Sequence, residues 1–164
     1  PKRRVTLIDR GQAAGIVFDT VYGARFGQPS TGHAMPADEV DGPLPLHLAL
    51  APGNLSAAEM IRRCRRGLLI PRFHYVNGLL QPRTALMTGL TREGTVLIED
   101  GTPTTSITTM RFTQSILDAF QHVLGVSKER RLVADPNTSL GCTLVPTLHL
   151  AQFRFTGHSE AESQ

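Results

Sequence analysis

Glycine and proline recur along this whole chain, and they constrain its fold more than any other feature. The 164 residues include 15 glycines and 11 prolines. Both residue types interrupt helices and favour turns, so they divide the apolar residues into short runs. Hydrophobic residues make up 40% of the chain, which is enough to fill the core of one domain. The sequence therefore predicts short strands and turns rather than long helices.

Runs of β-branched and aromatic residues predict where the strands lie. They occur at residues 5–8, 15–22, 46–50, 68–70, 73–76, 85–88, 95–99, 144–150 and 153–155. Tight turns are predicted at residues 9–12, at Asn77-Gly78 and at Asp100-Gly101. Residues 27–45, rich in Gly, Pro, Ser and Asp, predict a long irregular loop. We expect a mainly β (α+β) fold, with an antiparallel barrel-like or sandwich-like arrangement and two helices.

Two segments carry helical patterns. Ser56 and Glu59 form a capping box, and the helix that follows places Met60, Ile61 and Cys64 on one apolar face. Its last turns are expected to contain several arginines, with Gly67 just beyond its C-terminus. Residues 113–124 predict the second helix, ended by Gly125.

The candidate metal ligands are few and scattered. Of the six histidines, no two are three or four residues apart, so the helical two-histidine zinc motif is absent. Cys142 is a candidate thiolate ligand or nucleophile, although a small packed side chain is the favoured interpretation. Cys64 is expected to pack within the first helix. Two cysteines make no disulfide framework, which favours a reducing cytosol.

A group of arginines is the strongest basic feature of a chain whose formal net charge is only +3. Such a group can contact phosphates, or it can be the solvated end of a helix, where cations suit the helix dipole. We favour the helix end because no aromatic residues are interleaved with the basic ones. No run of about 18 apolar residues, as a membrane helix needs, is present. The group consists of Arg62, Arg63, Arg65 and Arg66.

The order of the motifs resembles the C-terminal domain of the TldD/PmbA family, also known as modulator of DNA gyrase. Two stretches are the most specific: residues 110–115, and residues 145–148 with the residues 155–157 to which they lead. Both stretches look like the PmbA-like, or TldE-like, branch. The resemblance extends over residues 5–157. The supporting elements, in chain order, are residues 3–15, Gly32-His33-Ala34, residues 47–54, Glu59-Met60-Ile61, residues 67–70, Val76-Asn77-Gly78 and residues 94–101.

This resemblance implies a cytoplasmic peptidase system. In the family, a metal-bearing TldD-type subunit pairs with a PmbA-type subunit and cleaves unfolded or modified peptides. The C-terminal β-barrel-like domain helps to form the dimer and a closed substrate chamber. A sheet edge that lines such a chamber can hold an extended peptide by main-chain hydrogen bonds. The candidate edges are residues 73–76 and residues 85–88.

The resemblance also implies what this chain lacks. The TldD-type site combines a His-Glu-x-x-x-His helix, which precedes this domain, with a cysteine near the chain end. That motif is missing here, and Cys142 precedes residues 145–148 more closely than the family's metal cysteine does. We expect residues 1–157 to be the C-terminal domain of a metal-lacking subunit, followed by a disordered tail at residues 158–164. Such a domain carries no cofactor itself, although the full system can carry zinc, and it forms a homodimer or pairs with a TldD-type subunit.

Two other functions stay open at this point. The chain can be a metal-binding peptidase domain that uses Cys142 with a histidine such as His33 or His149. Alternatively, it can be a nucleic-acid-binding or gyrase-associated module that works through the arginines at residues 62–66. We favour a peptidase-family domain that is not catalytic alone. A chain that begins with Pro and no Met is also expected to be a fragment of something longer, or to have a processed or engineered start.

Overall fold

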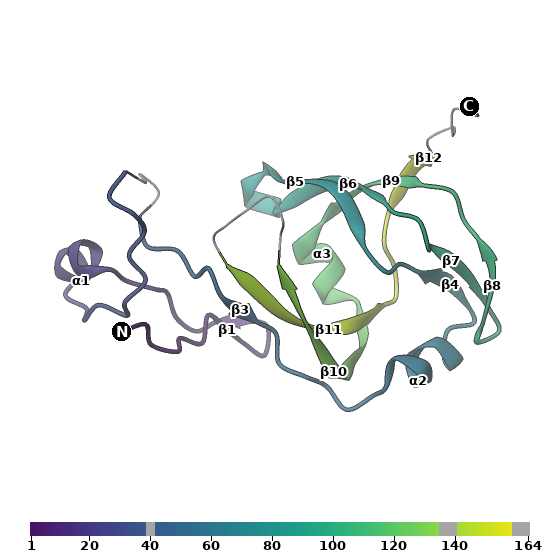
Figure 1. The fold of residues 1–164 in the computed structure, drawn as a ribbon, viewed down its shortest axis with the longest axis horizontal. Coiled ribbons are helices and arrows are strands. Elements are labelled where there is room, and N and C mark those ends of the chain that lie inside the picture. Colours follow the sequence, from purple (N-terminus) through teal and green to yellow (C-terminus); the bar gives the residue numbers. More distant parts are fainter. Residues whose placement is uncertain (39–41, 135–140, 159–164) are drawn as a thin grey trace. The chain divides into compact units, whose positions relative to one another are not determined.

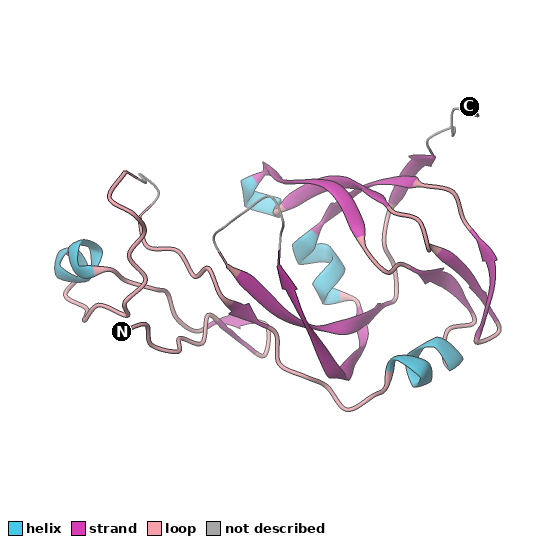
Figure 2. Ribbon diagram, in the orientation of Figure 1, coloured by secondary structure: helices cyan, strands magenta, loops and turns pink. Residues whose placement is uncertain are grey.

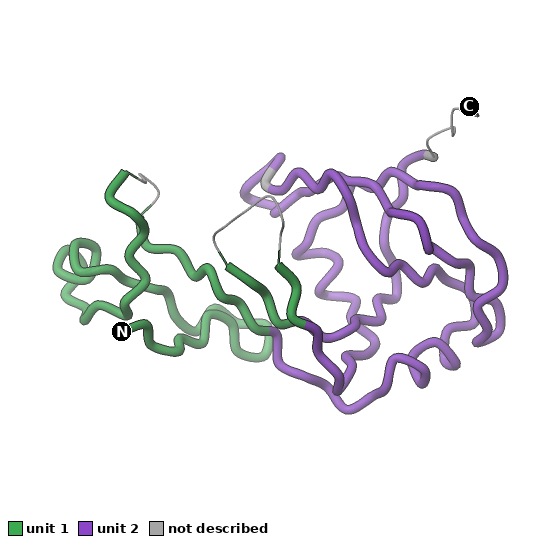
Figure 3. The backbone as a smooth tube through the Cα atoms, in the orientation of Figure 1, with its two compact units in different colours: residues 1–49, 132–144 green, residues 50–131, 145–164 purple. Residues whose placement is uncertain are grey.

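The structure is a computed structural model that describes residues 1–38, 42–134 and 141–158, apart from the side chains of Leu79 and His158. Short strands dominate it (Figures 1 and 2), and the described helices are also short. The chain divides into two compact units, shown in Figure 3. Unit 1 contains residues 1–49 and 132–144, and unit 2 contains residues 50–131 and 145–164. Of the tail predicted at residues 158–164, His158 instead ends a strand, and residues 159–164 lie outside the described residues.

Unit 1 begins with a small hairpin. Strands β1 (Ile8–Asp9) and β2 (Gln12–Ala13) pair antiparallel, with Ile8 opposite Ala13. The turn residues Arg10 and Gly11 both have positive φ, 48° and 82°, as a tight type I′ hairpin turn requires. The predicted turn at residues 9–12 is therefore confirmed. The strand predicted at residues 5–8 is shorter than expected, because β1 begins only at Ile8.

The strand predicted at residues 15–22 is wrong, because a helix begins within it. Helix α1 (Thr20–Phe26) starts after Asp19, whose side chain accepts a hydrogen bond from the Tyr22 amide at 2.6 Å. Gly27 ends the helix in the left-handed conformation at φ 63°. These two caps outweigh the β preference of the residues between them. Beyond Gly27, residues 28–38 and 42–45 contain no helix or strand, which confirms the predicted loop over its described part.

Unit 2 contains two antiparallel sheets. The larger one has the order β12 (Phe155–His158), β9 (Met110–Ser115), β6 (Leu86–Thr91) and β5 (Phe73–Gln81). The smaller one has the order β4 (Arg66–Leu69), β7 (Val96–Glu99) and β8 (Thr102–Ser106). Asp100 and Gly101, with φ 45° and 79°, form the predicted turn between β7 and β8.

A third sheet has the order β10 (Val123–Ala134), β11 (Cys142–Leu150) and β3 (Leu48–Ala49). In it β11 and β3 are parallel, with Thr143 opposite Leu48. Residues of β10 and β11 belong to both units. The predicted mainly β class is confirmed, and within the described residues none of the sheets closes on itself. Of the two predicted arrangements, separate sheets correspond to the sandwich-like one.

The predicted capping box is confirmed at helix α2 (Ala57–Arg62). The Ser56 hydroxyl accepts from the Glu59 amide at 3.2 Å, and the Glu59 carboxylate accepts from the Ser56 amide at 2.6 Å. These two hydrogen bonds satisfy two amides that the first turn of a helix leaves without partners. The Ser56 hydroxyl also donates to the Glu59 carboxylate at 2.7 Å, and the bonds that this carboxylate accepts from the Ser56 amide and hydroxyl lower the pKa of Glu59.

The end of this helix was predicted too late. Helix α2 ends at Arg62, so Cys64 follows the helix instead of lying on its apolar face, and Gly67 lies in strand β4. The cause is tertiary: the β7–β8 turn supplies new hydrogen-bond donors to this segment. The Gly101 amide donates to the Cys64 carbonyl at 2.9 Å, and the Asp100 amide donates to the Arg65 carbonyl at 2.7 Å.

Two further predictions are corrected in the larger sheet. Asn77-Gly78 is not a turn but part of β5, where Asn77 pairs with Thr88, and the chain reverses at the short helix η1 (Pro82–Thr84). The second predicted helix is also shorter, because residues 113–115 pair with β6 at the end of β9. Helix α3 (Ile116–Gln121) begins after Ser115, and Gly125 lies within β10.

The core of unit 2 is an aromatic cluster around Phe112, whose side chain is completely buried. Its ring centroid lies 4.7 Å from that of Phe73 and 5.3 Å from that of Phe153. On the neighbouring strand Gly89 faces this ring, and a Cβ there would lie 2.7 Å from the Phe112 ring edge. The absence of a side chain at Gly89 is therefore what allows Phe112 to fill the centre of the sheet.

We expect Ser56→Ala to lower the free energy of unfolding by about 1 kcal/mol, because it removes the acceptor that caps α2. Urea unfolding followed by circular dichroism measures the change. Ser106→Ala, at an exposed position of β8, is the control and should change stability by less than about 0.5 kcal/mol. Equal effects of the two substitutions would show that the capping box does not stabilise the helix.

Phe112→Ala should destabilise the chain by about 3–5 kcal/mol, because it opens a cavity among rigid aromatic neighbours. Phe120→Ala removes the same atoms from a side chain that is 53% exposed, and it should cost much less. The same urea titration compares them. A smaller loss at Phe112 than at Phe120 would contradict the assignment of the core.

Candidate functional site

Strand β5 forms one edge of the larger sheet in unit 2. Its neighbour β6 lies between β5 and β9, so both sides of β6 are already paired. Of the two predicted peptide-binding edges, only residues 73–76 therefore belong to an edge strand of the described sheet. Residues 85–88 lie largely on the interior strand, where no further strand can pair.

The main chain of β5 offers hydrogen-bonding groups at Phe73. The Arg92 amide donates to the Arg72 carbonyl at 3.2 Å, and Phe73 is the next residue along, opposite Thr91. Antiparallel pairs alternate between hydrogen-bonded and non-hydrogen-bonded positions. The N–H and C=O groups of Phe73 are therefore directed away from β6, towards a strand that could be added.

Beyond Phe73 the edge strand carries exposed apolar side chains. Tyr75, Leu80 and Val76 are 74%, 54% and 48% exposed. Tyr75 has a positive φ of 50° and lies where the pairing register with β6 shifts, between His74 and Asn77. Such a bulge bends an edge strand and limits the length over which another strand can pair with it. Over the residues that the structure describes, the edge of β5 is thus unpaired, apolar and short.

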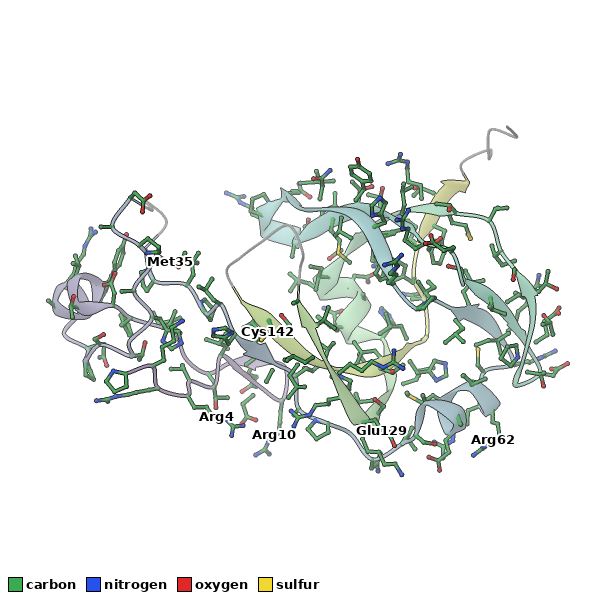
Figure 4. The ribbon with its side chains drawn as sticks, viewed as in Figure 1. Arg4, Arg10, Met35, Arg62, Glu129 and Cys142 are labelled. Carbon is green, nitrogen blue, oxygen red and sulfur yellow. The ribbon has the colours of Figure 1, made fainter. Side chains whose placement is uncertain are left out.

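Cys142 begins strand β11 in unit 1 (Figure 4), and the structure places His47 beside it. The Cys142 sulfur lies 3.8 Å from His47 Nδ1, and the Cys142 amide donates to the same nitrogen at 3.4 Å. The sequence pointed instead to His33 or His149. His33 is buried, with its Nδ1 2.9 Å from the Thr31 hydroxyl. His149 lies seven residues further along β11, where strand alternation turns it to the opposite face.

A complete zinc site does not follow from this pair. Structural zinc takes four ligands, and catalytic zinc takes three protein ligands and a water molecule. Within the part of the chain that the structure describes, no group of three or more His, Cys, Asp or Glu side chains is arranged to hold a metal ion. Cys142 and His47 offer two ligands of suitable chemistry, so we assign no catalytic step to a metal here.

The four arginines predicted as one basic group lie on three kinds of structure. Arg62 ends helix α2 (Figure 4), Arg63 is its C-cap, Arg65 follows, and Arg66 begins strand β4. All four are exposed. Only Arg62 and Arg63 lie at the C-terminal end of α2, where the helix dipole favours cations. The prediction that the arginines form a helix end therefore applies to these two and not to Arg65 and Arg66. They do not form a continuous basic stripe along one helix.

Sequence reasoning missed His47 as the neighbour of Cys142. The two residues are 95 positions apart, and their contact depends on the parallel pairing of β3 with β11. Parallel strands need a long connection, and a pairing of this kind leaves no local pattern in the sequence. The open edge of β5 was likewise undetermined, because strand order is decided by tertiary pairing.

The described residues thus form a mainly β fold with an apolar sheet edge at β5 and a Cys142–His47 contact. The chain belongs to the PmbA/TldD family: the model of the PmbA/TldA metallopeptidase C-terminal domain matches residues 1–157. The predicted resemblance is confirmed. No curated protein sequence matches the chain.

Solved structures of similar proteins share this fold. TldE from Thermococcus kodakarensis has a TM-score of 0.79 and 21% identity, over 96% of this chain and 34% of that one. A candidate modulator of a DNA gyrase from Thermotoga maritima has a TM-score of 0.71 and 17% identity, over 92% and 32%. Another from Bacteroides thetaiotaomicron has a TM-score of 0.66 and 20% identity, over 95% and 31%. The chain thus spans about a third of the length of these proteins.

Among the described helices, none is long and apolar enough to cross a membrane.

We expect the purified chain to carry less than one zinc ion per molecule after dialysis, because Cys142 and His47 alone make a weak site. Metal analysis by mass spectrometry measures the zinc content. One tightly held zinc ion per chain that is lost in Cys142→Ser but kept in Cys64→Ser would contradict this expectation. That result would make Cys142 a metal ligand.

Proposed function

We propose that this chain is a non-catalytic part of a PmbA/TldD-type peptidase subunit. In that role it shapes the substrate chamber and the dimer interface of an enzyme that degrades unfolded or modified peptides. The observation that carries the proposal is the free, apolar edge of β5, where Phe73 turns its main-chain groups outward. A sheet edge binds extended peptides through the main chain, which requires no particular peptide sequence.

Exposed apolar side chains outside β5 support the interface role. Leu117 and Phe120, both on helix α3, are each 53% exposed, and Leu124 at the start of β10 is 63% exposed. Leu117 and Phe120 are three positions apart in α3, so they lie on one side of that helix. Large exposed apolar side chains on one helix face are typical of a surface that another chain covers. We propose a second subunit as that chain, either a copy of this protein or a TldD-type subunit.

The proposed division of labour follows from the ligands that the described residues offer. Two ligands do not make a catalytic zinc site, so the catalytic metal of the system is proposed to lie in the TldD-type subunit. This chain then contributes peptide binding and shape. The cytoplasm is the proposed compartment, since two unpaired cysteines suit a reducing environment.

Peptide binding at β5 can be measured by fluorescence anisotropy with a labelled, unfolded peptide of about ten residues. We expect the double variant Tyr75→Ser/Val76→Ser to weaken binding about tenfold or more, because it removes exposed apolar contacts beside the edge. The matched control is Leu117→Ser/Phe120→Ser, which changes similarly exposed residues on α3 and should bind as the unchanged chain does.

A second probe tests the main-chain part of the proposal. The same peptide with alternate amides N-methylated cannot donate hydrogen bonds to a strand edge, and it should lose most of its affinity. If the methylated peptide binds equally well, or if the α3 variant loses as much affinity as the β5 variant, the edge of β5 is not the peptide site.

A further inference from the structure

A polar hollow lies within unit 2, apart from strand β5. Its volume is about 270 Å³, and it is lined by Gln114, Asp118, Gln152, Phe153 and Arg154. These residues come from β9, from helix α3 and from the segment that leads into β12. The segments that carry the most specific family motifs, at residues 110–115 and 155–157, pair with each other beside it, with Phe155 opposite Phe112.

Gln114 holds the walls of this hollow in place. Its side chain is 5% exposed, and both ends of the amide are used. The nitrogen donates to the Asp118 carboxylate at 2.9 Å and to the Ser115 carbonyl at 3.0 Å, while the oxygen accepts from the Arg154 amide at 2.8 Å. A buried and fully bonded amide is costly to displace. Asp118 and Arg154 are therefore positioned by the same side chain.

A second set of contacts orders the rim. His122 Nδ1 lies 2.8 Å from the Asp118 carbonyl, and His122 Nε2 lies 3.1 Å from the Gln152 amide nitrogen. The Gln152 nitrogen also lies 3.3 Å from His122 Nδ1, so it contacts the imidazole through both ring nitrogens. In the tautomer with the proton on Nδ1, His122 donates to the Asp118 carbonyl. His122 thereby links the helix that carries Asp118 to the segment that carries Arg154.

The residues that line the hollow include an acidic one, Asp118, a basic one, Arg154, and an apolar one, Phe153. The Asp118 carboxylate receives one hydrogen bond from Gln114, and its other oxygen lies 3.8 Å from His122. Among the described residues, no carboxylate forms an ion pair with the Arg154 guanidinium, although that residue lines the hollow. The ring of Phe153 stacks on that of Phe73 at 5.7 Å, so the apolar wall is fixed by the core.

We propose that this hollow binds a dipeptide in its zwitterionic form. The carboxylate pairs with the Arg154 guanidinium, the ammonium group pairs with Asp118, and the apolar C-terminal side chain contacts Phe153. Arginine suits a carboxylate because its planar group can donate two parallel hydrogen bonds. The volume lies just below the range of roughly 300–1,000 Å³ typical of small-molecule sites, which limits the ligand to one or two residues.

This inference goes beyond the proposed function and does not depend on it. The hollow and the β5 edge share neither their lining residues nor their chemistry: one recognises the charged ends of a very short peptide, and the other the main chain of a longer one. A dipeptide site would hold a product of peptide breakdown. Binding there can be present whether or not β5 binds peptides.

Isothermal titration of the purified chain with alanyl-phenylalanine tests the inference. Its N-acetylated form lacks the ammonium charge and its C-terminal amide lacks the carboxylate, and each should bind at least about tenfold more weakly. We expect Arg154→Gln to lose the preference for the free carboxylate over the amide, and Asp118→Asn to lose the preference for the free amine. Both substitutions keep the hydrogen bonds to Gln114, so the fold should survive.

Arg65→Gln is the matched control, because Arg65 is exposed and lies outside the hollow; it should bind the dipeptide as the unchanged chain does. Thermal unfolding of each variant shows that it is folded before binding is compared. The inference is overturned if folded, unchanged chain does not bind the dipeptide at millimolar concentration. It is also overturned if the blocked peptides bind as well as the free one, or if Arg65→Gln weakens binding as much as Arg154→Gln.

Discussion

The packing of Phe112 is the interaction on which the larger unit depends. The ring lies completely buried on β9 and contacts Phe73 from the edge strand β5 and Phe153 from the segment before β12. Gly89, on the strand between β9 and β5, leaves the space that the ring needs. The side chain of Phe112 therefore joins two residues that lie far from it in the sequence, one before it and one after it. It also fixes the ring of Phe153 that forms a wall of the polar hollow.

Hydrogen bonding across segments explains where local patterns were misleading. Helix α2 ends early because the β7–β8 turn donates to the carbonyls of Cys64 and Arg65. Residues 113–115 are a strand because they pair with β6, although their sequence continues a helical pattern. In each case hydrogen bonds to a distant segment stabilised the observed structure more than intrinsic helix preference stabilised the alternative. That preference is worth only a few tenths of a kcal/mol per residue. Helix α1 differs, since its caps at Asp19 and Gly27 are local signals.

The chain belongs to the PmbA/TldD family, and it spans about a third of the length of its solved relatives. It presents an edge strand, exposed apolar side chains on α3, and a hollow lined by Asp118 and Arg154 among other residues. Within the described residues, no group of three or more His, Cys, Asp or Glu side chains is arranged to hold a metal ion.

Four features could be predicted from the sequence: the mainly β class, the capping box at Ser56, the turns at residues 9–12 and 100–101, and the family. Each of these depends on residues close together in the chain or on the order of motifs, which a sequence displays directly. Three others became visible in the folded chain alone: β5 is an edge, His47 lies beside Cys142, and Gln114 holds Asp118 and Arg154 around one hollow. His47 and Cys142 are 95 positions apart in the sequence, and Gln114 and Arg154 are 40 positions apart. These contacts arise from strand pairing and burial, which depend on the whole chain and leave no local pattern.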